Sequence, residues 1–255
     1  MGMFDWTKGN RSKADRFART VVQMVAPRRL KPLSPDDLDV SSELKQPIKI
    51  RFAQTDTAYE GATLLVQKRY AWRGYPKAQV YGNPNRVTIL THLADEVVGT
   101  VTVGYDSEQQ GLLADEVYKD KIDELRKQGR VVGELSKLAI DEDHGSKQVL
   151  AGMIHIAFLY GLMHECTDAV IEVVPRHQTF YEKKLGFRVF GEERMNNRVH
   201  KSVVLLHLPM AEMQQKIEQF GGQGSESSER SLYPFFFSQE EQRGILARLL
   251  AEDKE

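Results

Sequence analysis

The chain has 255 residues, and its 35 Lys+Arg against 36 Asp+Glu give a formal net charge of −1, which argues against a dedicated nucleic-acid binder. One cysteine, Cys166, excludes an intramolecular disulfide and favours a reducing compartment. The first residues lack the pattern of a signal peptide, and no apolar run is long enough for a spanning helix. We therefore expect a cytoplasmic protein.

Residues 1–46 differ in composition from the rest of the chain. Between residues 8 and 31 there are eight basic residues and one acid. Apolar residues recur there at helical spacing: Phe17, Thr20, Val21, Met24 and Val25. The pattern predicts a basic amphipathic helix that ends before Pro27, followed by an irregular linker. Two interpretations remain open: an accessory helix packed on the domain, or a docking surface for an acidic protein or for the anionic inner membrane.

A globular pattern extends over residues 47–210. Strands are expected at 48–52, 87–93, 97–105, 131–140, 169–174 and 203–208. Helices are expected at 56–70, 115–128, 147–165 and 178–185. The order includes a hairpin early and a strand–helix–strand crossover late, which predicts an α/β (α+β) fold with a central mixed, mostly antiparallel sheet flanked by helices.

Two of these elements are predicted to be buried. The helix at 147–165 is apolar around most of its circumference, so it should pack against the sheet. The strand at 169–174 is continuously apolar, as in a central sheet position.

Residues 211–255 are expected to form a C-terminal linker and helix. The stretch 221–231 is rich in Gly, Ser and Glu and reads as a linker, and the helix is expected at 239–250. Between them lie Phe235, Phe236 and Phe237. Three consecutive phenylalanines should pack either on the core or on a partner chain.

The common catalytic motifs are absent from the sequence. It holds no Walker loop, no Gly-x-Gly-x-x-Gly, no His-Glu-x-x-His and no Gly-x-Ser-x-Gly. His155 and His164 are nine residues apart, a spacing unsuited to a shared metal ion on one helix face. No basic residues surround Cys166 to activate its thiol. We therefore expect no metal and no cysteine nucleophile.

Two stretches carry a family resemblance. Residues 175–187 read Pro-Arg-His-Gln-Thr-Phe-Tyr-Glu-Lys-Lys-Leu-Gly-Phe, which resembles the final helix motif of the GNAT N-acyltransferase superfamily. Residues 134–140 read Glu-Leu-Ser-Lys-Leu-Ala-Ile, which is similar to the fourth-strand motif of acyl-homoserine-lactone synthases and, more closely, of FeeM-like N-acyl amino acid synthases. The resemblance covers residues 60–208. It implies a GNAT fold that moves a long acyl chain from acyl carrier protein to an amine, usually that of an amino acid.

The resemblance also implies the catalytic residues. Glu134 matches the motif glutamate and is the expected base that deprotonates the amine. A glutamate in an apolar strand needs a partner or a function, so an ion pair with Arg126 or Arg130 is the alternative. Backbone N–H groups around Leu138 are expected to hold the oxyanion. Tyr181 is expected to protonate the departing thiolate, or else to be a half-buried helix residue.

Arginines are the expected ligands for an acceptor carboxylate, because guanidinium binds carboxylate bidentately. Arg69, Arg126 and Arg130 are the candidates, and Arg130 is preferred because it precedes Glu134 by four residues. The alternative for each arginine is a surface charge that binds no substrate. The family commonly has Asn before Pro-Arg-His where this chain has Val174, a departure that puts one polar contact near the acyl site in doubt.

The loop before the helix at 147–165 bears on the acyl donor. Acyl-CoA-dependent relatives carry Gln/Arg-x-x-Gly-x-Gly/Ala there, which this chain lacks. His144, Gly145, Ser146 and Lys147 are expected to hold the single phosphodiester of a phosphopantetheine. The basic segment at residues 8–31 would complement an acidic carrier protein. We therefore favour acyl carrier protein over acyl-CoA as the source of the acyl-phosphopantetheine donor, with no tightly bound cofactor.

Two other functions are compatible with the same fold. One is a sensor that binds an acyl thioester or lipid without turnover. The other is an N-acetyltransferase that uses acetyl-CoA. In every case the partners are small molecules or carrier protein, and peripheral membrane contact through residues 8–31 stays open.

Overall fold

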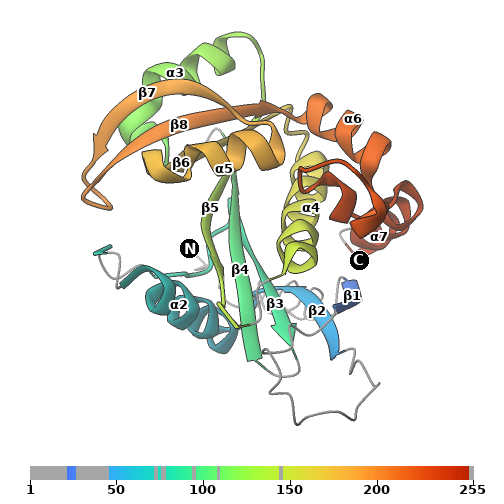
Figure 1. Ribbon diagram of the computed structural model, residues 1–255. Coiled ribbons are helices and arrows are strands. Elements are labelled where there is room, and N and C mark those ends of the chain that lie inside the picture. Colours follow the sequence, from blue (N-terminus) through green and yellow to red (C-terminus); the bar gives the residue numbers. More distant parts are fainter. Residues whose placement is uncertain are drawn as a thin grey trace, which may run out of the picture.

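The protein is built on one eight-stranded sheet with the spatial order β1-β2-β3-β4-β5-β6-β8-β7 (Figure 1). The computed structural model describes residues 22–26, 46–71, 74–75, 79–93, 96–107, 110–143 and 146–252. The strands are β1 (Val22–Ala26), β2 (Gln46–Phe52), β3 (Arg86–Leu93), β4 (Glu96–Tyr105), β5 (Val132–Ile140), β6 (Asp168–Val173), β7 (Arg188–Asn196) and β8 (Lys201–Pro209). Neighbouring strands are antiparallel except β5 and β6, which are parallel.

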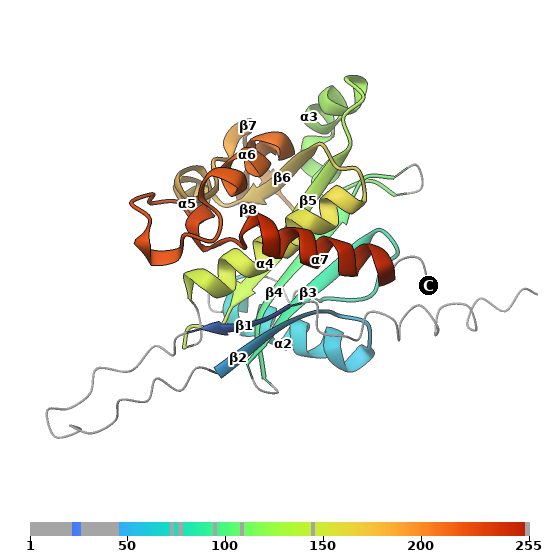
Figure 2. The same cartoon turned by 90° about the vertical axis from the view of Figure 1, so that its right-hand side faces the viewer.

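Helices cover both faces of this sheet. They are α2 (Asp56–Ala71), α3 (Asp115–Lys127), α4 (Lys147–Met163), α5 (Pro175–Leu185), α6 (Met210–Phe220) and α7 (Gln239–Glu252). Side chains alternate across a strand, so Leu90 packs in the cluster under α2 while its neighbour Ile89 packs in the main core with α4. The helices α2 and α3 thus lie on one face, and α4 to α7 lie on the other (Figure 2). The mixed, mostly antiparallel sheet flanked by helices confirms the predicted fold class.

The helix α4 is buried on all sides, as its sequence predicts. It begins at the N-cap Ser146, whose hydroxyl accepts a hydrogen bond from the Val149 N–H at 3.1 Å. It lies between the sheet and the C-terminal elements, where α7 crosses it (Figure 2). Among the described helices, none combines the length and the apolar character needed to cross a bilayer.

The three phenylalanines pack on the core of their own chain. Phe236 and Phe237 are 2% and 6% exposed, and both rings stack on His155 in α4. The His155 Nδ1 accepts the Phe237 N–H at 3.0 Å, and its Nε2 lies 3.1 Å from Oε1 of Gln242. Burial lowers the pKa of His155 to about 4, so the ring is neutral. A neutral histidine therefore ties the C-terminal segment to α4.

Two expectations about the ends of the chain are wrong. Residues 22–26 form the edge strand β1, paired with β2, and not the end of a helix; the rest of the segment 8–31 lies outside the described residues. The stretch 221–231 is not an open linker, because the Gly222 N–H donates to the Phe236 carbonyl and Lys184 Nζ to the Arg230 carbonyl. Residues 210–220 form α6. Pairing and packing with the rest of the fold override weak local patterns here.

Candidate active site

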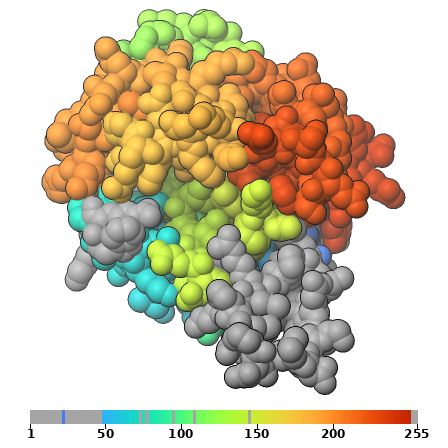
Figure 3. Space-filling model, in the orientation of Figure 1, coloured from blue at the N-terminus to red at the C-terminus, as the bar shows by residue number. Residues whose placement is uncertain are grey.

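A cleft opens where the two parallel strands of the sheet part. The pairs between β5 and β6 run only from Val132–Asp168 to Glu134–Val170. Beyond them lies a cavity of about 470 Å³. Its lining comes from β5, β6, α5, the end of β7 and the segment before β3: among others Glu134, Leu138, Glu172, Tyr181, Arg198 and Arg86. In the space-filling view, α5 and the neighbouring strands β7 and β8 form the gold and orange upper part of one face, above the yellow-green region (Figure 3).

A bulge in β5 shapes the floor of this cleft. Thr102 pairs with Ser136 and Thr100 with Ala139, so Val101 alone faces both Lys137 and Leu138. Lys137 has a φ of 52°, a left-handed conformation that is uncommon for a lysine in a strand. The Leu138 carbonyl accepts a hydrogen bond from the Tyr70 hydroxyl at 2.8 Å. The bulge places Leu138 in the cavity lining, where the sequence predicts it to be.

The acidic and phenolic groups reach the cleft from opposite faces of the sheet. Glu134 and Glu172 follow Val132 and Val170 by two residues, so they share the face covered by α3. Tyr181 belongs to the main core, on the α4 face. The cleft thus joins an acidic side to a phenolic side across the gap between β5 and β6.

Glu134 is fully engaged by the protein. It is 2% exposed, its Oε1 accepts the Ala114 N–H and its Oε2 the Leu113 N–H, both at 2.8 Å. Arg86 lies 3.4 Å from Oε2, so the ion-pair partner is Arg86 and not Arg126 or Arg130. Burial raises the pKa of Glu134, against the lowering effect of these contacts. The carboxylate anchors the turn that leads into α3.

A second carboxylate, Glu172 in β6, lies in the same cleft. Arg198 Nη2 contacts its Oε2 at 2.5 Å, and Asn196 Nδ2 lies 3.2 Å from each oxygen. Burial raises the pKa of Glu172 to about 7, and the neighbouring Glu134 charge adds to this against the opposing effect of Arg198. The sequence analysis missed Glu172, although a glutamate inside an otherwise apolar strand is the same signal that drew attention to Glu134.

The two carboxylates are linked through the turn before α3. The Leu113 N–H donates to Glu134, and the Leu113 carbonyl accepts from Arg198 Nη1 at 3.1 Å. Arg198 in turn pairs with Glu172 and, at 3.2 Å, with Glu116 in α3. The start of α3 therefore fixes both acids relative to each other.

Three cations surround this acidic pair: Arg86, Lys137 and Arg198. The ammonium of Lys137 donates to the Gln79 carbonyl at 2.6 Å and lies 5.1 Å from the ring centroid of Tyr81. Burial lowers the pKa of Lys137 to about 8, and the charges of Arg86 and Arg198 act in the same direction. The cleft is therefore positive by one charge when all five groups are ionised.

The arginines expected from the sequence to clamp a carboxylate have other partners and do not line the cleft. They pair with acids elsewhere: Arg69 with Glu142, Arg126 with Asp106, Asp115 and Asp123, and Arg130 with Asp168. Hydrogen bonds to Asp115 and Asp106 raise the pKa of Arg126. These carboxylates already bind the guanidinium groups. Closeness to Glu134 in the sequence therefore does not predict which arginines line the cleft.

Tyr181 presents a phenol to the cleft. It is 8% exposed and packs edge-to-face on Phe180 and Phe187, at centroid distances of 5.2 and 6.2 Å. Within the described part of the chain its hydroxyl makes no hydrogen bond. Burial raises the pKa of Tyr181 to about 12, so the phenol keeps its proton near neutral pH. A protonated hydroxyl facing the cleft can act as a hydrogen-bond or proton donor.

The residues expected to hold a phosphate are only partly described. His144 and Gly145 lie outside the described residues. Ser146 uses its hydroxyl as the N-cap of α4, and the ammonium of Lys147 lies 5.2 Å from the ring centroid of Phe235. Val174, where relatives have Asn, lines the cleft with its apolar side chain.

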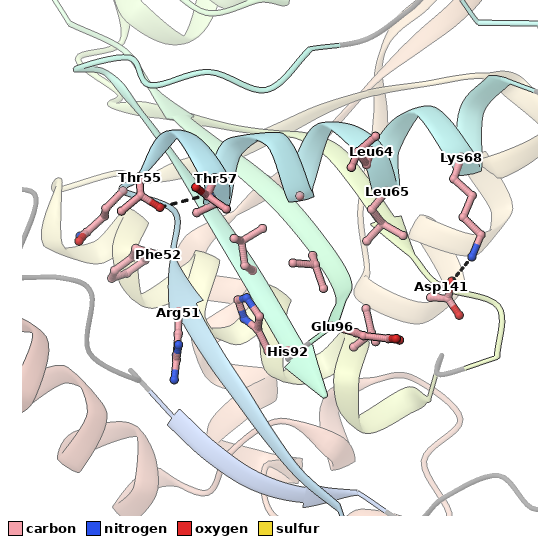
Figure 4. Close-up of a pocket in the computed structure, with 16 residues that line it drawn as sticks. Arg51, Phe52, Thr55, Thr57, Leu64, Leu65, Lys68, His92, Glu96 and Asp141 are labelled. Atoms are coloured by element: carbon pink, nitrogen blue, oxygen red, sulfur yellow. Dashed lines mark hydrogen bonds and ion pairs between the residues drawn. The ribbon is translucent and has the colours of Figure 1, made fainter. Parts of the chain in front are cut away.

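A second hollow lies between α2 and the sheet (Figure 4). It measures about 690 Å³ and is lined by residues of β2, α2, β3 and β4, half of them polar or charged, with Lys68 and Asp141 paired across one end at 2.8 Å. Across the described ranges, no cluster of three or more His, Cys, Asp or Glu side chains is arranged to hold a metal ion. The chemically equipped site of the described residues is therefore the cleft between β5 and β6.

Comparisons with known proteins identify the family. The model of the N-acyl amino acid synthase FeeM family matches residues 61–209. The solved structure of FeeM, an N-acyl amino acid synthase from uncultured soil microbes, is 21% identical, with a TM-score of 0.62 over 67% of this chain and 96% of that one. No curated protein matches.

Two further solved structures are similar over nearly the same region. The acyl-homoserine-lactone synthase LasI is 14% identical with a TM-score of 0.46, covering 65% of this chain and 91% of its own. An N-acetyltransferase from Staphylococcus aureus Mu50 is 11% identical with a TM-score of 0.43, covering 64% and 98%. The protein has the GNAT fold and is an acyltransferase, and the chain belongs to the FeeM family of N-acyl amino acid synthases.

Proposed function

We propose that the protein transfers a long acyl chain from the phosphopantetheine thioester of acyl carrier protein to the amine of an amino acid. The observation that carries this proposal is the cleft between β5 and β6, which has carboxylates on one side and the Tyr181 phenol on the other. The amine nucleophile must lose a proton and the thiolate leaving group must gain one. A carboxylate on one side of the cleft can accept the first proton, and the phenol on the other side can donate the second.

The reaction follows from these groups. A cleft carboxylate takes one proton from the ammonium, and the neutral amine forms an N–C bond with the thioester carbonyl. Backbone N–H groups of β5 around Leu138 stabilise the oxyanion while the intermediate lasts. The C–S bond then breaks and Tyr181 gives its proton to the thiolate. The nitrogen releases its second proton to solvent as the amide forms, and solvent returns a proton to Tyr181. The products are an N-acyl amino acid and free phosphopantetheine thiol.

An acceptor that carries a carboxylate fits the charges of the cleft. Arg86, Lys137 and Arg198 carry three positive charges against the two negative charges of Glu134 and Glu172, so the cleft offers an excess positive charge to the carboxylate of an acceptor. Of these cations, Lys137 is the best ligand because both arginines already bond protein oxygens, whereas the Lys137 ammonium has donors to spare beyond its bond to Gln79.

Acyl carrier protein is favoured as the donor over acyl-CoA. Ser146 is occupied as a helix cap, and the sequence before α4 lacks the glycine pattern that binds a pyrophosphate. A carrier-protein donor presents one phosphodiester and an acidic surface, which the basic residues between 8 and 31 would complement.

The proposal is tested by release of free thiol. The full chain is incubated with long-chain acyl carrier protein, long-chain acyl-CoA or acetyl-CoA, and with amino acids or the matching amines that lack a carboxylate. We expect release with the carrier-protein donor and amino acids, and at least about 10-fold less with the amines, because a lost charge-assisted pair costs 1.5–3 kcal/mol. Tight acyl binding without release would instead identify a binding module, and release with acetyl-CoA alone would identify an acetyltransferase.

Tyr181→Phe is expected to lower the turnover rate about 10- to 100-fold, because it removes the proton donor and keeps the ring in the core. Turnover is measured with an alkyl thioester and with an aryl thioester of the same acid. An aryl thiolate leaves without protonation, so the variant should regain most of the wild-type rate with it. An equal loss with both donors would assign the hydroxyl a role in positioning or packing.

A further inference from the structure

We propose that Glu172, and not Glu134, is the base that accepts the proton of the acceptor amine. The proposal rests on the proposed function and names the residue that carries out its first step. It also assigns Glu134 the task of positioning the turn before α3.

Both oxygens of Glu134 are already engaged by short bonds to the protein. Each accepts a backbone N–H at 2.8 Å, and Oε2 also faces Arg86 at 3.4 Å. Protonation of this carboxylate would weaken its hold on the turn that leads into α3, since a neutral carboxyl oxygen is a poorer acceptor than a carboxylate oxygen. A group whose protonation disrupts its own support is a poor base.

Glu172 has one oxygen that the protein holds more weakly than either oxygen of Glu134. Its Oε2 is held by Arg198, but its Oε1 has a single protein contact among the described residues, the 3.2 Å approach of Asn196 Nδ2. Its side chain is 9% exposed and lines the cavity from β6, just past the last pair with β5. An ammonium in the cleft can therefore approach Oε1 without displacing a strong bond.

The groups around Glu172 set the pKa and the orientation of its carboxylate. The groups facing it are Glu134 in β5, Tyr118 in α3, Asn196 in β7 and Arg198 in the following turn, with Lys137, His177 and Tyr181 also lining the cleft. Burial raises its pKa to about 7, near the pH at which a base works best. Arg198 keeps the carboxylate oriented, and the Asn196 amide is itself fixed because its Oδ1 accepts the Arg198 N–H at 2.9 Å.

The proton transfer itself is balanced. The N–H bond of the ammonium breaks, its proton binds Oε1 of Glu172, and the nitrogen lone pair becomes available to the thioester carbon. The carboxylic acid later returns the proton to solvent after the amide has formed. No oxidant, reductant or further reactant takes part.

The test compares Glu172→Gln and Glu134→Gln with the exposed Glu193→Gln as matched control. Initial rates of thiol release, after subtraction of the enzyme-free reaction, are measured against pH with an amino acid and with hydroxylamine, which is already neutral near pH 7 and needs no base. We expect Glu172→Gln to lose about 100-fold or more with the amino acid, and to lose the acidic limb of the pH profile. With hydroxylamine the same variant should stay within about 5-fold of wild type.

Glu134→Gln should retain an acidic limb even if its rate is lower, since Glu134 acts through the turn before α3. The limb should move to lower pH, because the variant removes the charge that helps to raise the pKa of Glu172. Equal losses of Glu172→Gln with both nucleophiles, or an acidic limb that vanishes in Glu134→Gln and persists in Glu172→Gln, would overturn the proposal. Far-ultraviolet circular dichroism of each variant confirms folding. Failure of the proposed function gives a different result from failure of this assignment, because then the wild type itself releases no thiol with any acceptor.

Discussion

Glu134→Ala is expected to lower the free energy of unfolding by about 3–5 kcal/mol, the cost of removing one member of a buried charge pair. The variant leaves the N–H groups of Leu113 and Ala114 without acceptors in a buried position, and it leaves Arg86 without its partner. Each unsatisfied buried donor costs about 1–3 kcal/mol. Urea denaturation followed by circular dichroism gives the difference.

Glu193→Ala is the control, because this glutamate is exposed in β7 and its loss should change stability by no more than about 0.5 kcal/mol. Glu134→Gln should fall between the two, since the amide oxygen can replace one of the two carboxylate acceptors. A loss below about 1 kcal/mol in Glu134→Ala would show that water replaces the carboxylate, and would remove the positioning role assigned to it.

The anchoring role of Glu134 explains why α3 matters to the site. Tyr118 in α3 donates from its hydroxyl to the Glu192 and Val203 carbonyls, and Gly191 lies so close to its ring that a Cβ there would be 2.6 Å from it. The N-terminal part of the helix is thus held by β7 and β8 through Tyr118 and by Glu134 through the preceding turn. Because Arg198 also bonds to Leu113, a shift of α3 would move the partner of Glu172.

Most of the fold is predictable because its central elements carry strong local patterns. The helix α4 is apolar throughout and β4 and β5 are long strands, so burial alone fixes their type. The edge strands β1 and β7 were not predicted. Charged residues dominate β7, and its conformation depends on pairing with β8, which no local window contains.

The site divides in the same way. Glu134, Leu138 and Tyr181 were predicted to be together, and the structure places all three in the cleft, because two contiguous motifs carry them. Arg86 and Arg198 come from separate elements, and only the folded sheet brings them to Glu134 and Glu172. Arg126 and Arg130, which precede the 134–140 motif, pair with aspartates instead, and sequence spacing does not predict these pairs.

The difference in the free energy of unfolding between Glu172→Gln and wild type is expected to change with pH. Between about pH 4.5 and pH 7 it should shift in favour of the variant by up to about 3 kcal/mol. Burial raises the pKa of Glu172 to about 7 in the folded protein, above the 4.5 of the free side chain. Within this window the folded state holds a proton that the unfolded state has released. Raising the pH therefore favours the unfolded wild type, whereas glutamine has no proton to lose.

Urea denaturation of both proteins at about pH 5 and about pH 8 measures this difference, and contributions from all other groups common to the two proteins cancel to first order. The Glu193→Gln control should show almost the same difference from wild type at both pH values, because its side chain is exposed. A constant difference for Glu172→Gln would mean that Arg198 and Asn196 compensate for the burial of the carboxylate. A rising difference, together with loss of activity in the same variant, would show that the protein maintains a carboxylate in this cleft at a cost in stability because the reaction requires it.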